Sequence, residues 1–415
     1  MRKLLGAVLA GCLALSMSAG VYAGEETTEA VSESEEREVV YTPVDTADIK
    51  VGFIFVGDEN EGYTEAHWNG AQEMMEALGL SDDQVIVKWS IPEDESCYDA
   101  AVDLADQGCN IIFANSFGHE DYMIEAAEEY PDIQFCHATG FQAASSGLEN
   151  MHNFFDNIYE ARYVAGVVAG MKLNEMIDDG TITEDTAKIG YVGAYPYAEV
   201  VSGYTSFFLG VRSVCPSATM EVRYDNSWAS FDLEKELAEA LIADGCVLIS
   251  QHADTTGAPT ACEAAGVPCV GYNISMLEVA PDVALTSASN NWGPYYTYAV
   301  DSVIHGYAID TDWSKGYSEG AVCITELGDS VAEGTAEAAA EAEEQIKSGE
   351  LHVFDTSTFT VDGQSLEDYL AANDDVNGEL GKYVYDGYFH ESDVDAGFGS
   401  APAFNIVIDG ITVAE

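Results

Sequence analysis

The sequence predicts an α/β protein with two parallel sheets, each flanked by helices. From Ile49 to Asn273, apolar runs of strand length alternate with amphipathic segments of helix length. This alternation is expected of parallel strands joined by crossover helices. The 415-residue chain is also too long for a single compact core, even without its first 48 residues. Two βα domains in series follow from these observations.

The first cycle of strands and helices lies between residues 49 and 137. Its apolar, strand-like runs are 49–56, 85–89, 111–114 and 133–137. Its helix-like segments are 64–78, 98–106 and 119–129.

The second cycle begins after Asn157 with a long helix, 159–176, whose small residues at 165–170 favour close packing. Its expected strands are 189–192, 220–224, 247–251 and 268–272. Its other expected helices are 199–214, 233–243 and 256–265. The pattern loosens after Asn273. There the sequence still predicts a helix at 331–348 and turns of hairpin type at 360–363 and 408–411.

The first residues have the features of an export signal. Arg2 and Lys3 precede an apolar run that is too short to span a bilayer, and small residues lead up to Gly24. We therefore expect a signal peptide at 1–23 and an exported protein. Residues 9–12, Leu-Ala-Gly-Cys, offer an alternative in which Cys12 carries a lipid anchor. The following residues, 24–48, are acidic and polar and should form a disordered linker.

The charge balance disfavours several partners. The chain has 74 acidic and 14 basic residues, a formal net charge of −60. Nucleic acid and anionic membranes are poor partners for such a surface. Eight cysteines follow Cys12, and no two of them form a Cys-x-x-Cys pair. Four of them, Cys109, Cys136, Cys246 and Cys269, lie in or beside apolar runs, so buried free thiols are expected, although export permits disulfides.

Aromatic and amide residues follow the predicted strands and are the candidate ligand-binding residues. Because ligands of open α/β sheets bind beyond the carboxyl ends of the strands, we expect these loops to converge on one cleft. Tyr63 is placed to stack on a flat ligand, although it could instead pack its loop against a helix. Trp228 is costly to leave in a loop without a partner, which favours a role in the cleft. The full candidate set is Tyr63, Asn115, Phe117, Asn226, Trp228, His252, Asp254, Tyr272, Asn273 and Trp292.

Catalytic and metal-binding motifs find no support in the sequence. His119 and His252 have acidic neighbours, but neither occurs in a His-x-x-x-His or His-Glu-x-x-His spacing. No serine has an assignable catalytic base in the sequence, and no Asp-x-Asp-x-Asp-Gly loop is present. Acidic residues at 58, 59 and 61 would repel phosphate from the first strand-to-helix loop. We expect no enzyme activity, no cofactor and no metal.

Several of these segments together resemble the basic membrane protein family of ABC-transporter substrate-binding proteins. The resemblance covers roughly residues 49–320 and follows the family's order. The segments that carry it are 62–67, 116–118, 137–140, 158–163, 226–228, 251–254, 271–273 and 291–296.

The resemblance implies a type I periplasmic-binding-protein fold, in which two Rossmann-like lobes joined by a hinge close on a ligand. Lobe 1 would comprise 49–157 plus about 274–310, and lobe 2 would comprise 158–273 plus about 311–350. The placement of the C-terminal segment, 351–415, is left open. A purine base or nucleoside is the implied ligand, with an ABC permease and ATPase as partners and the receptor itself a monomer.

Two departures from the family's nucleoside-binding pattern favour a free base such as adenine. Asn273 stands where nucleoside binders carry an aspartate for the ribose hydroxyls, and Trp292 lies where they carry a lysine near the hinge. The alternatives are a receptor for a sugar or another small solute, and a ligand sensor for a signalling partner. A sugar receptor would be expected to carry arginines after its strands, and these are scarce here.

Overall fold

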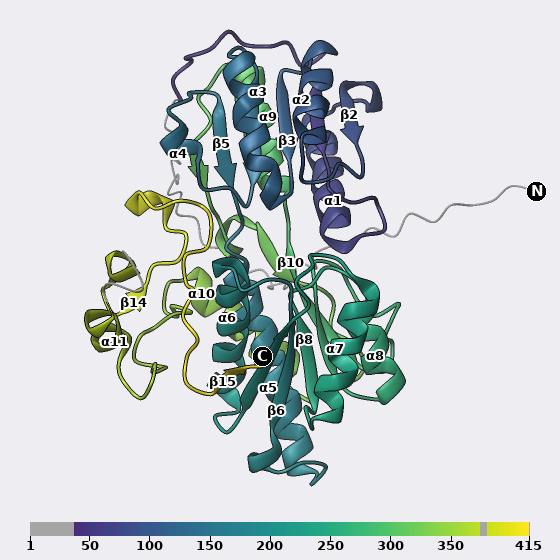
Figure 1. Cartoon of the computed structure of the whole chain (residues 1–415), viewed down its shortest axis with the longest axis vertical. Coiled ribbons are helices and arrows are strands. Elements are labelled where there is room, and N and C mark those ends of the chain that lie inside the picture. The colour runs from purple at the N-terminus through teal and green to yellow at the C-terminus, as the bar shows by residue number, and fades with distance from the viewer. Residues whose placement is uncertain (1–36, 374–379, 415) are drawn as a thin grey trace, which may run out of the picture.

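The computed structural model describes residues 37–373 and 380–414. Within these residues the strands form a six-stranded, a seven-stranded and a two-stranded sheet. The two larger sheets lie in separate lobes, one above the other along the long axis of the molecule, with helices beside each sheet (Figure 1). The prediction of an α/β fold with two Rossmann-like lobes joined by a hinge is confirmed.

Lobe 1 contains the six-stranded sheet, and all of its strand pairs are parallel. The strand order is β11-β5-β4-β3-β1-β2. Its strands are β1 (Val51–Ile54), β2 (Val85–Lys88), β3 (Ile111–Ala114), β4 (Gln134–Ala138), β5 (Met151–Phe154) and β11 (Asp312–Trp313). Its helices are α1 (Gly62–Leu78), α2 (Ser96–Asp106), α3 (Glu120–Glu129), α4 (Ala143–Ser146) and α9 (Gly293–His305).

Lobe 2 contains the seven-stranded sheet, in the order β12-β10-β9-β8-β6-β7-β15. Only the pairing of β12 with β10 is antiparallel among its described strand pairs. Its strands are β6 (Lys188–Gly193), β7 (Thr219–Tyr224), β8 (Leu248–Gln251), β9 (Cys269–Tyr272), β10 (Ala284–Asn290), β12 (Val322–Ile324) and β15 (Ile411–Val413). Its helices are α5 (Ile158–Asp178), α6 (Ala198–Val214), α7 (Phe231–Ala243), α8 (Gly257–Ala265) and α10 (Thr335–Lys347).

The apolar runs of the sequence become strands that are buried on both faces. Every residue of β1 and β3 is buried, as expected of parallel strands covered by helices on both sides. Val51 pairs with Val85 on one side and with Ile111 on the other, so the three strands run in register. The loops that follow them therefore lie together at one edge of the sheet.

The chain divides between the lobes differently from the boundaries that the sequence suggested. Residues 274–310 were assigned to lobe 1, but β10 lies in the sheet of lobe 2 and only α9 packs in lobe 1 against α1. Likewise β11, expected in lobe 2, pairs with β5 of lobe 1. Strand β10 is fully buried, yet it carries Thr, Ser and Asn, so its composition did not mark it as a core strand.

Three short crossings form the hinge between the lobes: residues 155–157, 291–292 and 314–321. Their backbones are hydrogen-bonded to one another. The Asn157 amide donates to the Lys315 carbonyl at 2.8 Å, and the Asn291 amide donates to the Ala321 carbonyl at 2.7 Å. The Ser314 hydroxyl also donates to Asn157 Oδ1 at 2.6 Å. The crossings are therefore tied to one another, while each lobe has its own sheet.

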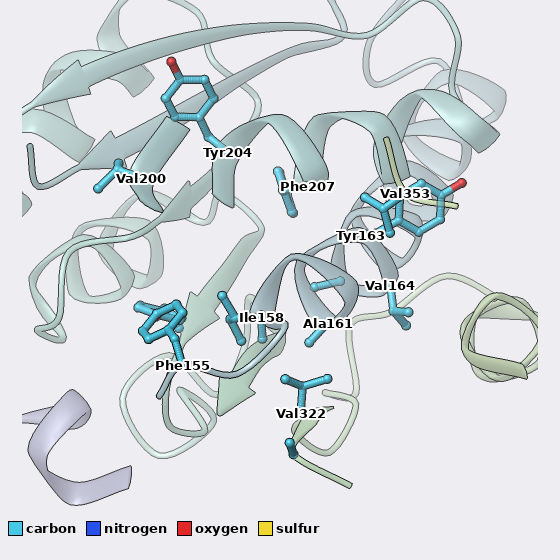
Figure 2. Close-up of a cluster of buried hydrophobic side chains, with 14 of the residues drawn as sticks. Phe155, Ile158, Ala161, Tyr163, Val164, Val200, Tyr204, Phe207, Val322 and Val353 are labelled. Atoms are coloured by element: carbon cyan, nitrogen blue, oxygen red, sulfur yellow. The ribbon is translucent and has the colours of Figure 1, made fainter. Parts of the chain in front are cut away.

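Helices α5 and α6 pack closely in lobe 2, as the small residues at 165–170 predicted. Figure 2 shows Ile158, Ala161 and Val164 of α5 in one apolar cluster with Phe207 of α6. Glycine is required at the crossing, because a Cβ on Gly166 would lie 2.1 Å from the Phe207 carbonyl oxygen.

The C-terminal segment packs on lobe 2 and reaches the edge of lobe 1 (Figure 1). It contains α11 (Leu366–Ala372), β13 (Val384–Tyr385) and β14 (Tyr388–Phe389). The turn at 360–363 is confirmed, with positive φ at Asp362 and Gly363 inside a Val361–Gln364 bridge. The hairpin expected at 408–411 is wrong, because the chain continues into β15, which adds to β7 in parallel.

The linker is ordered where the structure describes it. Arg37 lies over the rings of Tyr298 and Tyr307, with its guanidinium carbon 4.8 Å from each ring centroid. Its Nη2 also donates to the Ser302 hydroxyl at 2.8 Å. The expectation of disorder through residue 48 is therefore wrong for 37–48. The signal peptide, Cys12 and residues 24–36 lie outside the described residues.

Gly166→Ala is expected to destabilise the protein. The new Cβ would meet backbone on α6 and push the two helices apart, a type of overpacking that costs roughly 1–3 kcal/mol. We expect a clearly lower thermal midpoint in a calorimetric scan. Gly381→Ala is the control, because a Cβ there meets nothing within 4 Å. Equal midpoints for the two variants would contradict the close helix contact.

Candidate functional site

A cavity of about 110 Å³ lies between the lobes. Its lining comes from loops and helix starts that follow the strands of both sheets, as the sequence predicted for these loops. Lobe 1 contributes Val56, Gly57, Glu61, Tyr63, Asn115, Ser116, Phe117 and Thr139, and lobe 2 contributes Glu199, Trp228, Ala229, His252, Asp254 and Tyr272.

Tyr63 is fixed at the start of α1. Glu61 caps this helix, and its carboxylate oxygens accept hydrogen bonds from the backbone amides of Tyr63 at 2.8 Å and Thr64 at 2.9 Å. The Tyr63 hydroxyl donates to the Asn115 carbonyl at 2.6 Å. Its ring meets His67 edge-on, with centroids 4.5 Å apart. The ring is therefore held rigidly at the cavity wall, and its hydroxyl is already engaged.

Two further polar residues of lobe 1 retain hydrogen-bonding capacity. Asn115 Oδ1 accepts from the Val56 amide at 2.9 Å, but Asn115 Nδ2 makes only a long contact of 3.5 Å to the Thr64 hydroxyl. The Thr139 hydroxyl is buried and has no partner within the described structure. A buried polar group without a partner is costly, so both side chains are suited to a polar ligand.

The aromatic wall of lobe 2 is built around Trp228. The indole is half-buried after β7, and Tyr195 packs against it at a centroid distance of 5.0 Å and an interplanar angle of 62°. The Trp228 carbonyl accepts from the Asp254 amide at 3.0 Å, which ties its loop to the end of β8. Trp228 therefore faces the cavity from a supported position.

His252 and Glu199 form a buried pair on the same side. His252 Nε2 lies 3.2 Å from Glu199 Oε1, and its Nδ1 is buried with no partner among the described residues. Burial lowers the pKa of His252, and the nearby Glu199 carboxylate only partly offsets this. A neutral imidazole that donates to Glu199 from Nε2 leaves Nδ1 as an acceptor without a partner among the described residues.

Asp254 is a buried carboxyl with one satisfied oxygen. Its Oδ1 accepts from Asn273 Nδ2 at 2.9 Å. Burial raises the pKa of Asp254 well above its usual value, and the neighbouring Glu61 and Glu234 carboxylates raise it further. The side chain can therefore hold a proton in the closed cleft and act as either donor or acceptor.

Arg162 of α5 supports Tyr272 from behind. Its guanidinium carbon lies 3.9 Å from the centroid of the Tyr272 ring. Arg162 Nη1 also donates to the Tyr191 hydroxyl at 2.7 Å and to the Gln251 carbonyl at 3.1 Å. Arg162 does not line the cavity, and its contacts hold Tyr272 and the end of β8 in place.

Three of the candidate residues do not line the cavity. Asn226 is exposed and has a φ of 58°, so it serves the turn after β7. Asn273 lies behind Asp254 and holds it in place. Trp292 is fully buried in the hinge, where its ring stacks flat on His67 at 4.1 Å and 8°. The expectation that Trp292 occupies ligand space is therefore wrong, because its ring is part of the core between α1 and α9.

The other seven candidates meet at the cavity: Tyr63, Asn115, Phe117, Trp228, His252, Asp254 and Tyr272. Sequence reasoning missed Glu61, Thr139 and Glu199 as lining residues. Glu61 had a usable signal as a helix cap before Tyr63. Glu199 had none, since its role depends on a contact with His252 that lies 53 residues away.

The cavity lining contains three carboxyl residues, Glu61, Glu199 and Asp254, and no Lys or Arg. Within residues 37–373 and 380–414 no group of three or more His, Cys, Asp or Glu side chains could hold a metal ion. The buried free thiols are Cys97, Cys109, Cys136, Cys215, Cys246, Cys262 and Cys269. No helix in the described part of the chain has the length and apolarity to cross a membrane.

Two lobes with largely parallel sheets and a cavity between them are an architecture that solute-binding receptors use. The family model of PnrA-like ABC transporter substrate-binding proteins matches residues 49–357. The chain belongs to this family. It is therefore a receptor and not an enzyme, and it acts outside the cytoplasm, where it delivers a small molecule to an ABC permease and its ATPase.

Individual relatives agree with this assignment. A purine-binding protein of Brucella abortus is 33% identical over 343 residues, which cover 81% of this chain and 91% of that protein. A putative ABC transporter glucose-binding protein of Haloferax volcanii is 37% identical over 62% of each chain. A solute-binding protein of Aeropyrum pernix has the same fold, with a TM-score of 0.62 at 16% identity over 78% of this chain and 97% of that chain.

Asp254→Asn is expected to stabilise the ligand-free protein at pH 8. The folded-state pKa of Asp254 is raised, so its charged form is disfavoured by folding, and stability falls as pH rises above the unfolded-state value of about 4. Asparagine does not ionise, so the variant does not lose stability in this way as the pH rises. The gain in thermal midpoint over wild type should be larger at pH 8 than at pH 4.

The exposed Asp282→Asn is the matched control, because it removes the same formal charge outside the cavity. A D254N midpoint at pH 8 that equals or falls below those of wild type and D282N would contradict this account. It would mean that the Asp254 carboxylate is stabilised by the fold.

Proposed function

We propose that the protein is the receptor of an ABC importer for a purine base of the adenine type. The observation that carries the proposal is the composition of the interlobe cavity. It has an aromatic residue from each lobe, Tyr63 and Trp228, and polar side chains with unused hydrogen-bonding capacity. The purine-binding protein of Brucella abortus, with 33% identity over most of its length, supports the same ligand class.

Stacking and edge contacts have separate roles in this proposal. The rings of Tyr63 and Trp228 would contact the two faces of the base, a contact worth on the order of 1 kcal/mol beyond burial. At the base edge, Asn115 Nδ2 would donate a hydrogen bond and His252 Nδ1 would accept one. The free oxygen of Asp254 could do either. Adenine carries both donors and ring-nitrogen acceptors, so it matches this set.

Charge and size restrict the ligand further. Three carboxyl side chains line the cavity without a lysine or arginine, so phosphorylated ligands and other anions should be rejected. Residues of both lobes close in the cavity, so in the present lobe positions a compact base would be accommodated more readily than a nucleoside. Asn273 contributes only indirectly to this preference, because its amide is engaged with Asp254.

A small neutral sugar is the second candidate. Carboxyl groups beside aromatic rings can also bind sugar hydroxyls, and Glu199 and Asp254 provide such groups. The relative from Haloferax volcanii, named as a putative glucose-binding protein, favours this alternative. The two candidates differ in what holds the ligand: ring stacking for a base, and mainly carboxylate hydrogen bonds for a sugar.

A thermal-shift screen of the mature protein distinguishes these candidates. The panel contains adenine, guanine, hypoxanthine, xanthine, their nucleosides, AMP and glucose. A ligand at one hundred times its dissociation constant should stabilise the protein by about 2.7 kcal/mol. We expect adenine to raise the midpoint more than adenosine, and AMP to have no effect. A response to glucose alone would overturn the purine proposal, and a response to AMP would contradict the charge argument.

Trp228→Ala is expected to weaken adenine binding about 5- to 150-fold in titration calorimetry, because stacking on an aromatic side chain is worth roughly 1–3 kcal/mol per base. Phe231→Ala is the control, since this ring is exposed and lies three residues further along without lining the cavity. An unchanged affinity in W228A, with binding intact in F231A, would rule out stacking on Trp228.

A further inference from the structure

A continuous row of aromatic rings crosses the outer side of the cleft. In lobe 1, Phe141 stacks on Phe117 with centroids 6.2 Å apart and planes 28° apart. In lobe 2, Tyr197 stacks on Tyr195 at 5.1 Å and 13°, and Tyr195 packs against Trp228 at 5.0 Å. The row is joined between the lobes by Phe117 and Tyr197, whose rings stack at 5.5 Å and 27°.

The members of this row differ in their relation to the cavity. Phe117 and Trp228 line it, whereas Tyr197 and Phe141 do not. Tyr197 is 43% exposed, Phe117 37% and Phe141 60%, so the Phe117–Tyr197 junction lies on the solvent side of the cavity. Tyr197 therefore contacts a residue of the opposite lobe without being a lining residue itself.

We propose that Tyr197 is a latch residue, which holds the cleft closed by stacking on Phe117 and thereby sets the rate of ligand release. Separation of the lobes must break this contact and expose both ring faces to water, because the two residues belong to different lobes. The contact adds to the closed state without any contact to the ligand. The latch proposal rests on the proposed function, in which the interlobe cavity is the ligand site.

The position of Tyr197 links the latch to the ligand. Tyr197 is the residue immediately before α6, and its carbonyl accepts from the Val201 amide at 3.0 Å. Two residues further on, Glu199 lines the cavity and meets His252 at 3.2 Å. A ligand that engages His252 and Glu199 would fix the start of α6, and with it the ring of Tyr197 opposite Phe117.

The kinetic test uses adenine as the probe and compares wild type with Tyr197→Ser and Tyr197→Phe. An aromatic pair of this kind should change the closed-state equilibrium about 2- to 10-fold. We expect stopped-flow measurements to show Y197S releasing adenine faster by that factor, with an association rate within twofold of wild type. Y197F keeps the ring and should behave like wild type.

Phe231→Ser is the matched control, because Phe231 is also an aromatic residue of lobe 2 that is 43% exposed, and it is not part of the row. A release rate in Y197S equal to that in F231S and wild type would overturn the latch. A loss of affinity caused only by slower association would overturn it as well, since a latch acts after the ligand has entered.

Small-angle X-ray scattering of the ligand-free proteins tests the latch separately from ligand identity. If stacking on Phe117 favours closure, Y197S should have a larger radius of gyration than F231S and wild type. If adenine does not bind, the purine proposal fails, and the scattering comparison still decides on the latch. Equal radii for the three proteins would reject it.

Discussion

The hinge between the lobes is the constraint on which the cleft depends. Three chain segments cross between the lobes, and hydrogen bonds join them, including the bond from the Asn157 amide to the Lys315 carbonyl at 2.8 Å. Trp292 lies in one of these crossings and stacks on His67 of α1, which anchors that crossing to lobe 1. Because each lobe has its own sheet and the crossings are hydrogen-bonded to one another, the hinge sets how the cavity-lining loops of the two lobes face each other.

The cavity combines a rigid frame with groups that are poorly satisfied until a ligand enters. Tyr63 and Asp254 are held by hydrogen bonds, but Thr139 Oγ1 and His252 Nδ1 are buried without partners within the described structure. Burial also raises the pKa of Asp254. Such features cost stability in the receptor, and under the proposed function a matching ligand would relieve them.

Much of the fold could be predicted from periodicity, and the failures have physical causes. Runs such as 51–54 and 111–114 are apolar on both faces and could be recognised as buried parallel strands. Strand β10 could not be recognised as a core strand, because several of its buried positions carry Thr, Ser and Asn side chains. Its place in the sheet is set by backbone pairing with β9 and β12. In the site, strand-end position identified Tyr63, Trp228 and His252 correctly as lining residues.

The sequence by itself determined the fold class, the family and the edge of each sheet at which the cleft lies, because these depend on local periodicity and on the order of elements. Only the tertiary structure decided which strand-end residues line the cavity. Asn273 and Trp292 follow strands just as His252 does, yet one supports Asp254 and the other stacks in the hinge core. Their roles depend on partners from distant segments, and spacing along the chain carries no record of those contacts.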